Sequence, residues 1–75
     1  MSELMDGVGI GAIVLCLHDR DIGVVLDIYP WRSEAAVFWN KDGLCKSETV
    51  TKCNSHVFEI LIQGKPFVYG DESFI

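Results

Sequence analysis

The sequence predicts an all-β fold, a small barrel built from five short strands. Two observations support this prediction. Short apolar runs rich in β-branched and aromatic residues recur along the 75-residue chain, and charged or glycine-containing turns separate them. No stretch places apolar residues at the 3.6-residue spacing of an amphipathic helix. A sheet that curls around one interior would bury one apolar face of every strand and leave few open edges.

The first two strands are predicted at residues 12–17 and 22–29. The run AIVLCL at 12–17 is continuously apolar, which is typical of a strand buried on both faces. The charged turn HDRD follows it. In 22–29 every second residue is apolar, so these residues are expected to face the core: Ile22, Val24, Leu26 and Ile28. Pro30 ends the strand, because proline has no backbone N–H to donate to a neighbouring strand.

The third strand is predicted at residues 35–40, AAVFWN. Its alternation places Val37 and Trp39 on one side and Phe38 on the other. The dipeptide Asp42-Gly43 follows, and glycine supplies the positive φ that a tight hairpin turn requires. We therefore expect a hairpin between the third and fourth strands.

The fourth and fifth strands are predicted at residues 45–52 and 56–62. The run CKSETVTK at 45–52 is polar and rich in threonine, as suits an edge strand. The run HVFEILI at 56–62 is the last strand, and the tail at 64–75 is apolar enough to dock on the barrel. We expect one domain over residues 1–75, with a short N-terminal arm, a barrel core at about 9–63 and this C-terminal tail.

Composition and charge restrict the class of partner. The chain is 49% apolar, which is too rich for a disordered protein, and its eleven acidic and six basic residues leave a net charge of −5. A protein that binds nucleic acid is usually basic, because it must displace counterions from phosphate. The acidic balance makes a nucleic-acid partner unlikely and favours a protein partner.

The apolar run at residues 8–17 is not expected to act as a leader or a membrane anchor. Glu3 and Asp6 precede it where a signal peptide requires positive charge, and the run is shorter than the ~20 residues that span a bilayer. We predict a soluble chain without a membrane partner. Its cysteines are odd in number and lack the spacing of a disulfide framework, which indicates a reducing compartment: Cys16, Cys45 and Cys53.

The order of these motifs resembles that of the small SH3-like barrel proteins of tailed bacteriophages. In that family a G-x-hydrophobic strand is followed by a G-hydrophobic-V strand, a V-x-W strand, a dipeptide turn and a last strand of L-x-x-L character. The matching positions span residues 9–63 and are Gly11, Gly23, Val24, Val37, Trp39, Gly43, Phe58 and Leu61. The chain departs from the pattern in its apolar first strand and its aromatic tail, which suggest extra buried surface in an oligomer or a larger assembly. The resemblance implies a barrel of KOW or Tudor architecture that binds partners and catalyses no reaction.

Four residues are weak candidates for metal ligands: Cys16, His18, Cys53 and His56. The first and last strands are neighbours in an SH3-like barrel, so the four side chains could approach one another, and zinc would accept this ligand set. However, the chain has no paired CxxC motif, and the spacing matches no standard zinc finger. We predict no metal and no cofactor, with Cys16 as a small core residue and the histidines at strand ends.

No catalytic constellation is predicted. The glycines of GVGIGAI lack the preceding strand and following helix of a dinucleotide-binding loop. Asp19 and Asp21 fall in a polar turn, where solvation explains them better than acid–base chemistry. We expect a protein that is not an enzyme.

Recognition residues are predicted among the aromatic side chains that the core does not claim. Tyr29 and Phe38 alternate outwards from their strands, and Trp31 and Arg32 follow Pro30. Trp, Tyr and Arg dominate binding hot spots. With two tail residues, the predicted partner-binding set is Tyr29, Trp31, Arg32, Phe38, Phe67 and Tyr69. The alternative is that Trp31 or the tail aromatics cover the open end of the barrel and only extend its core.

Three functions follow from these patterns, in falling order. The first is a non-enzymatic protein–protein interaction module, a phage accessory or adaptor protein that binds a host or virion protein. The second is a virion component, a capsid decoration or connector protein whose apolar first strand and tail contact the capsid or neighbouring copies in a homo-oligomer. The third is a nucleic-acid-associated barrel of KOW or Tudor type, which the charge disfavours. The expected location is the host cytoplasm or the virion.

Overall fold

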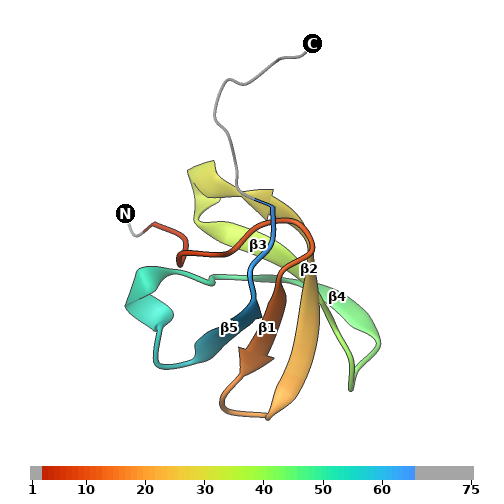
Figure 1. The fold of residues 1–75 in the computed structure, drawn as a ribbon. Coiled ribbons are helices and arrows are strands. Elements are labelled where there is room, and N and C mark those ends of the chain that lie inside the picture. Colours follow the sequence, from red (N-terminus) through yellow and green to blue (C-terminus); the bar gives the residue numbers. More distant parts are fainter. Residues whose placement is uncertain (1–2, 66–75) are drawn as a thin grey trace.

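The protein folds as one five-stranded antiparallel sheet. The computed structural model describes residues 3–65, and Figure 1 shows the arrangement of the strands. The strands are β1 (Ile13–Cys16), β2 (Asp21–Tyr29), β3 (Glu34–Trp39), β4 (Leu44–Glu48) and β5 (Phe58–Ile62). Their order across the sheet is β4-β3-β2-β1-β5, so β4 and β5 form its two edges. Two 3-10 helices, η1 (Pro30–Arg32) and η2 (Lys52–Asn54), follow β2 and precede β5, respectively.

The all-β prediction is confirmed, and each observed strand overlaps one predicted run. The fourth run is shorter than predicted: β4 ends at Glu48, because Thr51 pairs with Leu4 of the N-terminal arm and Lys52 begins η2. β2 ends at Tyr29, and Pro30 begins η1, as expected from the missing N–H of proline. Gly43 has φ +66° and donates its N–H to the Trp39 carbonyl at 2.9 Å, which closes the β3–β4 hairpin. The part of the chain that the structure describes contains no α-helix.

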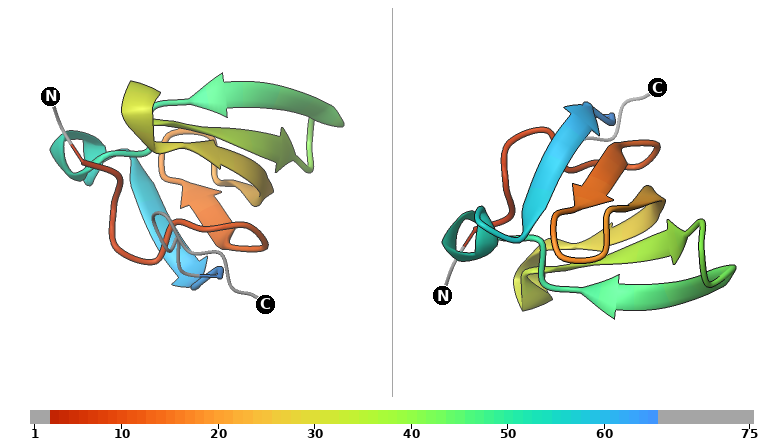
Figure 2. Two further views of the ribbon diagram at one scale, coloured as in Figure 1. Left: turned by 90° about the horizontal axis from the view of Figure 1, so that it is seen from above. Right: turned by 90° about the horizontal axis from the view of Figure 1, so that it is seen from below.

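The sheet curls around one small apolar core. Trp39 of β3 and Phe58 of β5 stack with ring centroids 6.4 Å apart, although two other strands lie between β3 and β5 in the sheet. Figure 2 shows the strands bending round this interior. Between β4 and β5 the sheet is open, since no backbone pairing joins these strands within residues 3–65. The buried apolar residues are Val8, Ala12, Val14, Val25, Ile28, Ala35, Val37, Trp39, Val50 and Phe58.

The predicted inner face of β2 is wrong over most of the strand. Gly23 and Val25 are buried, whereas Ile22 and Leu26 are 47% and 50% exposed. The physical reason is a packing requirement at Gly23, which pairs directly with Trp39 of β3. A Cβ on Gly23 would lie 2.7 Å from Trp39 Cε3, so the indole ring occupies the space of any larger side chain.

A β-bulge then returns the end of β2 to the predicted face. The register with β3 shifts between Val25 and Asp27, which leaves Leu26 as the extra residue. Because of this shift Ile28 faces inwards and is buried, as expected. Tyr29 consequently shares the opposite face with its partner on β3, Glu34.

β1 is buried on one face only, so the prediction of two buried faces is wrong. Ala12 and Val14 are fully buried, whereas Ile13 and Leu15 are half-buried on the opposite side. No element in the described part of the chain covers that side of β1. Residues 44–47 of β4 are all exposed, which agrees with the prediction of an edge strand.

Both ends of the described chain pack beside the sheet. In the N-terminal arm, Met5 donates its N–H to the Val50 carbonyl at 3.1 Å, and Glu3 accepts the Lys52 N–H at 2.9 Å. Gly9 and Gly64 cross in close contact, because a Cβ on Gly64 would lie 2.3 Å from the Gly9 carbonyl oxygen. The prediction that the tail docks on the barrel concerns residues after Lys65, which are outside the described part of the chain.

Residues 3–65 include no helix of the length and hydropathy that crossing a bilayer requires.

Candidate functional site

The side of the sheet that faces away from the core, which we call the outer face, has an apolar centre. Backbone pairing aligns one row of side chains from one edge of the sheet to the other: Ile62, Ile13, Val24, Phe38 and Cys45. A second pairing places Leu15 beside Ile22 on the same face. The outer face therefore has no charged residue at its centre.

Several of these side chains are well exposed to solvent. Ile22 and Leu26 are about half exposed, and Phe38 and Ile62 are 41% and 61% exposed. A soluble monomer rarely presents a contiguous apolar patch of more than a few hundred Å², and patches of this size usually mark interaction sites. The exposed residues are neighbours in the sheet, so they form one contiguous apolar patch.

The composition of the outer face is a consequence of packing on the inner face. Trp39 and Val37 fill the interior opposite Gly23, so the large side chains of β2 have to lie outside. This placement was missed by sequence reasoning, which assigned Ile22 and Leu26 to the core. The signal in the sequence is the pair Gly23 and Trp39, because a large indole ring needs a residue without a side chain beside it. This signal identifies the outer face only when the register of β2 and β3 is known.

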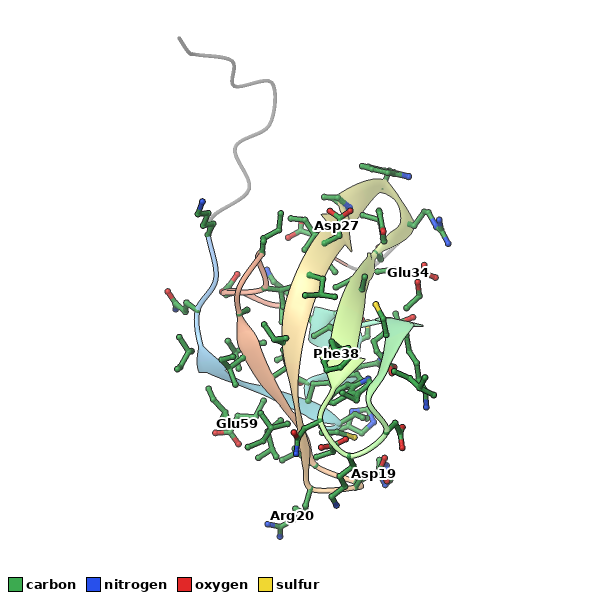
Figure 3. All side chains as sticks on the ribbon, turned by 90° about the vertical axis from the view of Figure 1, so that its right-hand side faces the viewer. Asp19, Arg20, Asp27, Glu34, Phe38 and Glu59 are labelled. Atoms are coloured by element: carbon green, nitrogen blue, oxygen red, sulfur yellow. The ribbon has the colours of Figure 1, made fainter. Side chains whose placement is uncertain are left out.

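Charged residues border the apolar patch. Figure 3 shows Phe38 near the middle of this view, Asp27 and Glu34 towards one end, and Asp19 and Arg20 towards the other. Glu59 lies at the side, on β5, where it pairs with Leu15. An apolar centre with a polar rim is the usual anatomy of a protein-binding surface.

Three of the predicted recognition residues meet at one end of the outer face, and we call this group the aromatic corner: Tyr29, Trp31 and Arg32. The Tyr29 and Trp31 rings meet edge to face with centroids 5.9 Å apart, and the Arg32 guanidinium lies 5.6 Å from the Tyr29 centroid. Arg32 also forms a 3.0 Å ion pair with Glu34. The turn itself is tight, since Ser33 has φ 56° and donates its N–H to the Pro30 carbonyl at 3.1 Å.

Trp31 is 68% exposed, and it does not cover the end of the core. Its ring contact is with Tyr29, which itself lies on the outer face. The fourth predicted residue, Phe38, lies in the middle of the same face, whereas the remaining two, Phe67 and Tyr69, lie outside the described residues. The structure thus brings four predicted recognition residues to one side of the sheet.

The weak metal candidates are not brought together as a ligand set. Cys16 and His18 line a hollow of about 260 Å³ beside β1, together with Trp39 and Phe58. Cys53 lies in η2. Among residues 3–65 no group of three or more His, Cys, Asp or Glu side chains has the arrangement of a metal site.

Two carboxylates beside this hollow have structural partners. Asp21 is buried, not solvated as expected, and both of its oxygens accept the Lys41 N–H at 3.1 Å. Glu48 Oε2 accepts a hydrogen bond from Trp39 Nε1 at 2.9 Å. These bonds hold the β3–β4 hairpin and the indole in place, so the two carboxylates serve the fold.

The exposed tip of the same hairpin carries a local ion pair. Lys46 Nζ donates to Asp42 Oδ2 at 3.1 Å. This hydrogen bond and the charge of Asp42 raise the pKa of Lys46 above its usual value of 10.5. Lys46 therefore stays fully charged at neutral pH.

Comparison of the chain with protein families, with curated proteins and with solved structures gives no match.

Proposed function

We propose that this chain is a non-enzymatic protein-binding module and that the outer face is its binding surface. The observation that carries the proposal is the row of uncharged side chains that crosses all five strands and remains exposed at Phe38 and Ile62. Such a face is costly to leave in water, because apolar surface gains about 25 cal/mol per Å² on burial. A partner that covers it would recover this free energy.

The aromatic corner supports the same assignment. Trp, Tyr and Arg are the residue types that contribute most to binding free energy at interfaces. Trp31 is largely exposed, yet its contact with Tyr29 limits its freedom, so a partner would lose little side-chain entropy on binding it. The corner therefore extends the apolar patch with a preorganised anchor.

We further propose that this five-stranded sheet is an SH3-like barrel. The strand order β4-β3-β2-β1-β5 and the stacking of Trp39 on Phe58 support it. Together with the sequence resemblance, this barrel favours a phage accessory or adaptor protein that acts on a host or virion protein. A virion component is the second candidate, favoured by the same apolar face if neighbouring copies or the capsid cover it.

The experiment compares three baits in affinity capture: the unaltered chain, Phe38→Ser and Leu44→Ser. Leu44 is the matched control, because it is 58% exposed but pairs with the inward-facing Trp39 and so lies off the outer face. Any captured protein is purified, and its affinity for each variant is measured by calorimetry. We expect Phe38→Ser to weaken binding at least about tenfold and Leu44→Ser to leave it unchanged.

Thermal unfolding of both variants completes the test. Phe38 is partly exposed, so its replacement should leave the fold intact, and a loss of binding then reports the surface itself. Equal affinity of all three proteins for the partner would show that the outer face is not the binding site.

A further inference from the structure

We infer that the outer face binds a short segment of a partner protein in which apolar side chains are bordered by lysine or arginine. This inference rests on the proposed function and adds the chemistry of the partner. It follows from the charges around the apolar patch.

The rim of the outer face is acidic. Seven charged residues border the patch, four carboxylates and three cations: Asp19, Asp27, Glu34, Glu59, Arg20, Arg32 and Lys41. Arg32 is already paired with Glu34 at 3.0 Å, and Lys41 Nζ donates to the Asp19 backbone carbonyl at 2.6 Å. The rim thus has one negative charge in excess, and Asp27 and Glu59 are its carboxylates for which no ion pair is seen within residues 3–65.

The carboxylates nearest the patch are available to a partner. Asp27 accepts the Ile28 N–H at 2.8 Å through one oxygen, and its second oxygen can accept from a cation. Glu59 is exposed beside Leu15. Among the described residues no ion pair involves Asp27 or Glu59. A lysine or arginine of the partner would supply the missing countercharge.

A second copy of this chain fits the outer face less well. In a two-fold dimer the same rim would meet itself, and its excess negative charge would oppose association. A short basic and apolar segment satisfies both the apolar centre and the charge of the rim.

The test selects short peptides from a displayed random library against the purified chain, with counter-selection on Phe38→Ser. We expect the retained peptides to contain apolar residues flanked by Lys or Arg and to bind the unaltered chain but not Phe38→Ser. Peptides that depend on Phe38 but carry acidic or uncharged flanks would overturn the inference and keep the proposed function. If no peptide depends on Phe38, the inference is wrong, whereas the proposed function is decided by the affinities of Phe38→Ser and Leu44→Ser for a captured protein.

Charge variants then test the rim directly with a selected peptide. The double variant Asp27→Asn with Glu59→Gln should weaken binding about tenfold and reduce its salt dependence. The control is Glu3→Gln with Asp6→Asn on the N-terminal arm, which changes the net charge equally and should leave the affinity unchanged. Equal weakening by both pairs would show that only overall charge matters and would overturn the inference. A dimer in sedimentation that Phe38→Ser dissociates would overturn it too, since the occupant would be a second copy.

Discussion

Replacement of Gly23 by alanine tests which side of β2 faces the core. In the structure the new Cβ would lie 2.5 Å from Val37 Cγ1 and 2.7 Å from Trp39 Cε3, whereas ordinary carbon contacts are about 3.5–4.0 Å. Both neighbours are buried and cannot move away freely. Overpacking of this kind costs about 1–3 kcal/mol, and the lower entropy of the unfolded alanine chain offsets about 0.4–1 kcal/mol.

We therefore expect Gly23→Ala to lower the free energy of unfolding by about 1–2 kcal/mol, measured by urea denaturation with circular dichroism. For a domain of this size the melting temperature should fall by roughly 5–15 °C. If β2 had its opposite face inwards, Gly23 would be exposed, and alanine would be neutral or stabilising. An unchanged or raised stability would thus refute the assignment of the outer face.

A double-mutant cycle with Val37→Ala identifies the cause of this destabilisation. Val37→Ala removes the Cγ1 atom that the new methyl group meets. The cost of the double variant should be smaller than the sum of the two single costs by at least about 0.5 kcal/mol. Strict additivity would show that Gly23 and Val37 do not share the same space.

Three further substitutions test the contacts around the sheet, each by thermal unfolding. Trp31→Ala should change the free energy of unfolding by less than about 1 kcal/mol, because the side chain is mostly exposed; a large loss would mean that it belongs to the core. Gly64→Ala should lower the free energy of unfolding by about 2–3 kcal/mol, since the new Cβ meets the Gly9 carbonyl oxygen. A neutral result would contradict the close contact between the N-terminal arm and the segment after β5. Asp21→Ala should cost about 1–3 kcal/mol by leaving the Lys41 N–H without its acceptor, whereas Asp21→Asn, which keeps an acceptor oxygen, should cost less. If Asp21→Ala and Asp21→Asn lower the free energy of unfolding equally, loss of the hydrogen bond to Lys41 is not the cause of the destabilisation.

The positions of the strands and turns could be predicted because local chemistry decides them. Pro30 cannot donate a hydrogen bond, so β2 ends at Tyr29, and Gly43 tolerates the positive φ of the hairpin turn. The polar run after Gly43 became an edge strand, as its composition indicated. These properties depend on each residue and its neighbours along the chain.

The candidate site could be predicted only in part. Tyr29, Trp31 and Phe38 were recognised as aromatic residues without an evident place in the core, and the structure puts them on one side of the sheet. Ile22 and Leu26 were assigned to the interior, because alternation alone favours burial of the more apolar face. They form much of the outer face instead.

The sequence by itself determined five short strands, their turns and an acidic net charge. Strand propensity, proline and glycine act on the backbone near each residue, and the net charge is a sum over all residues. Only the tertiary structure decided which face of β2 is inside. Pairing of Gly23 with Trp39 and the bulge at Leu26 are contacts between strands, and period-two alternation is satisfied equally well by either face. Because the Trp39 ring leaves space only for Gly23 on the inner face of β2, the larger apolar side chains of this strand lie on the outer face, exposed to solvent.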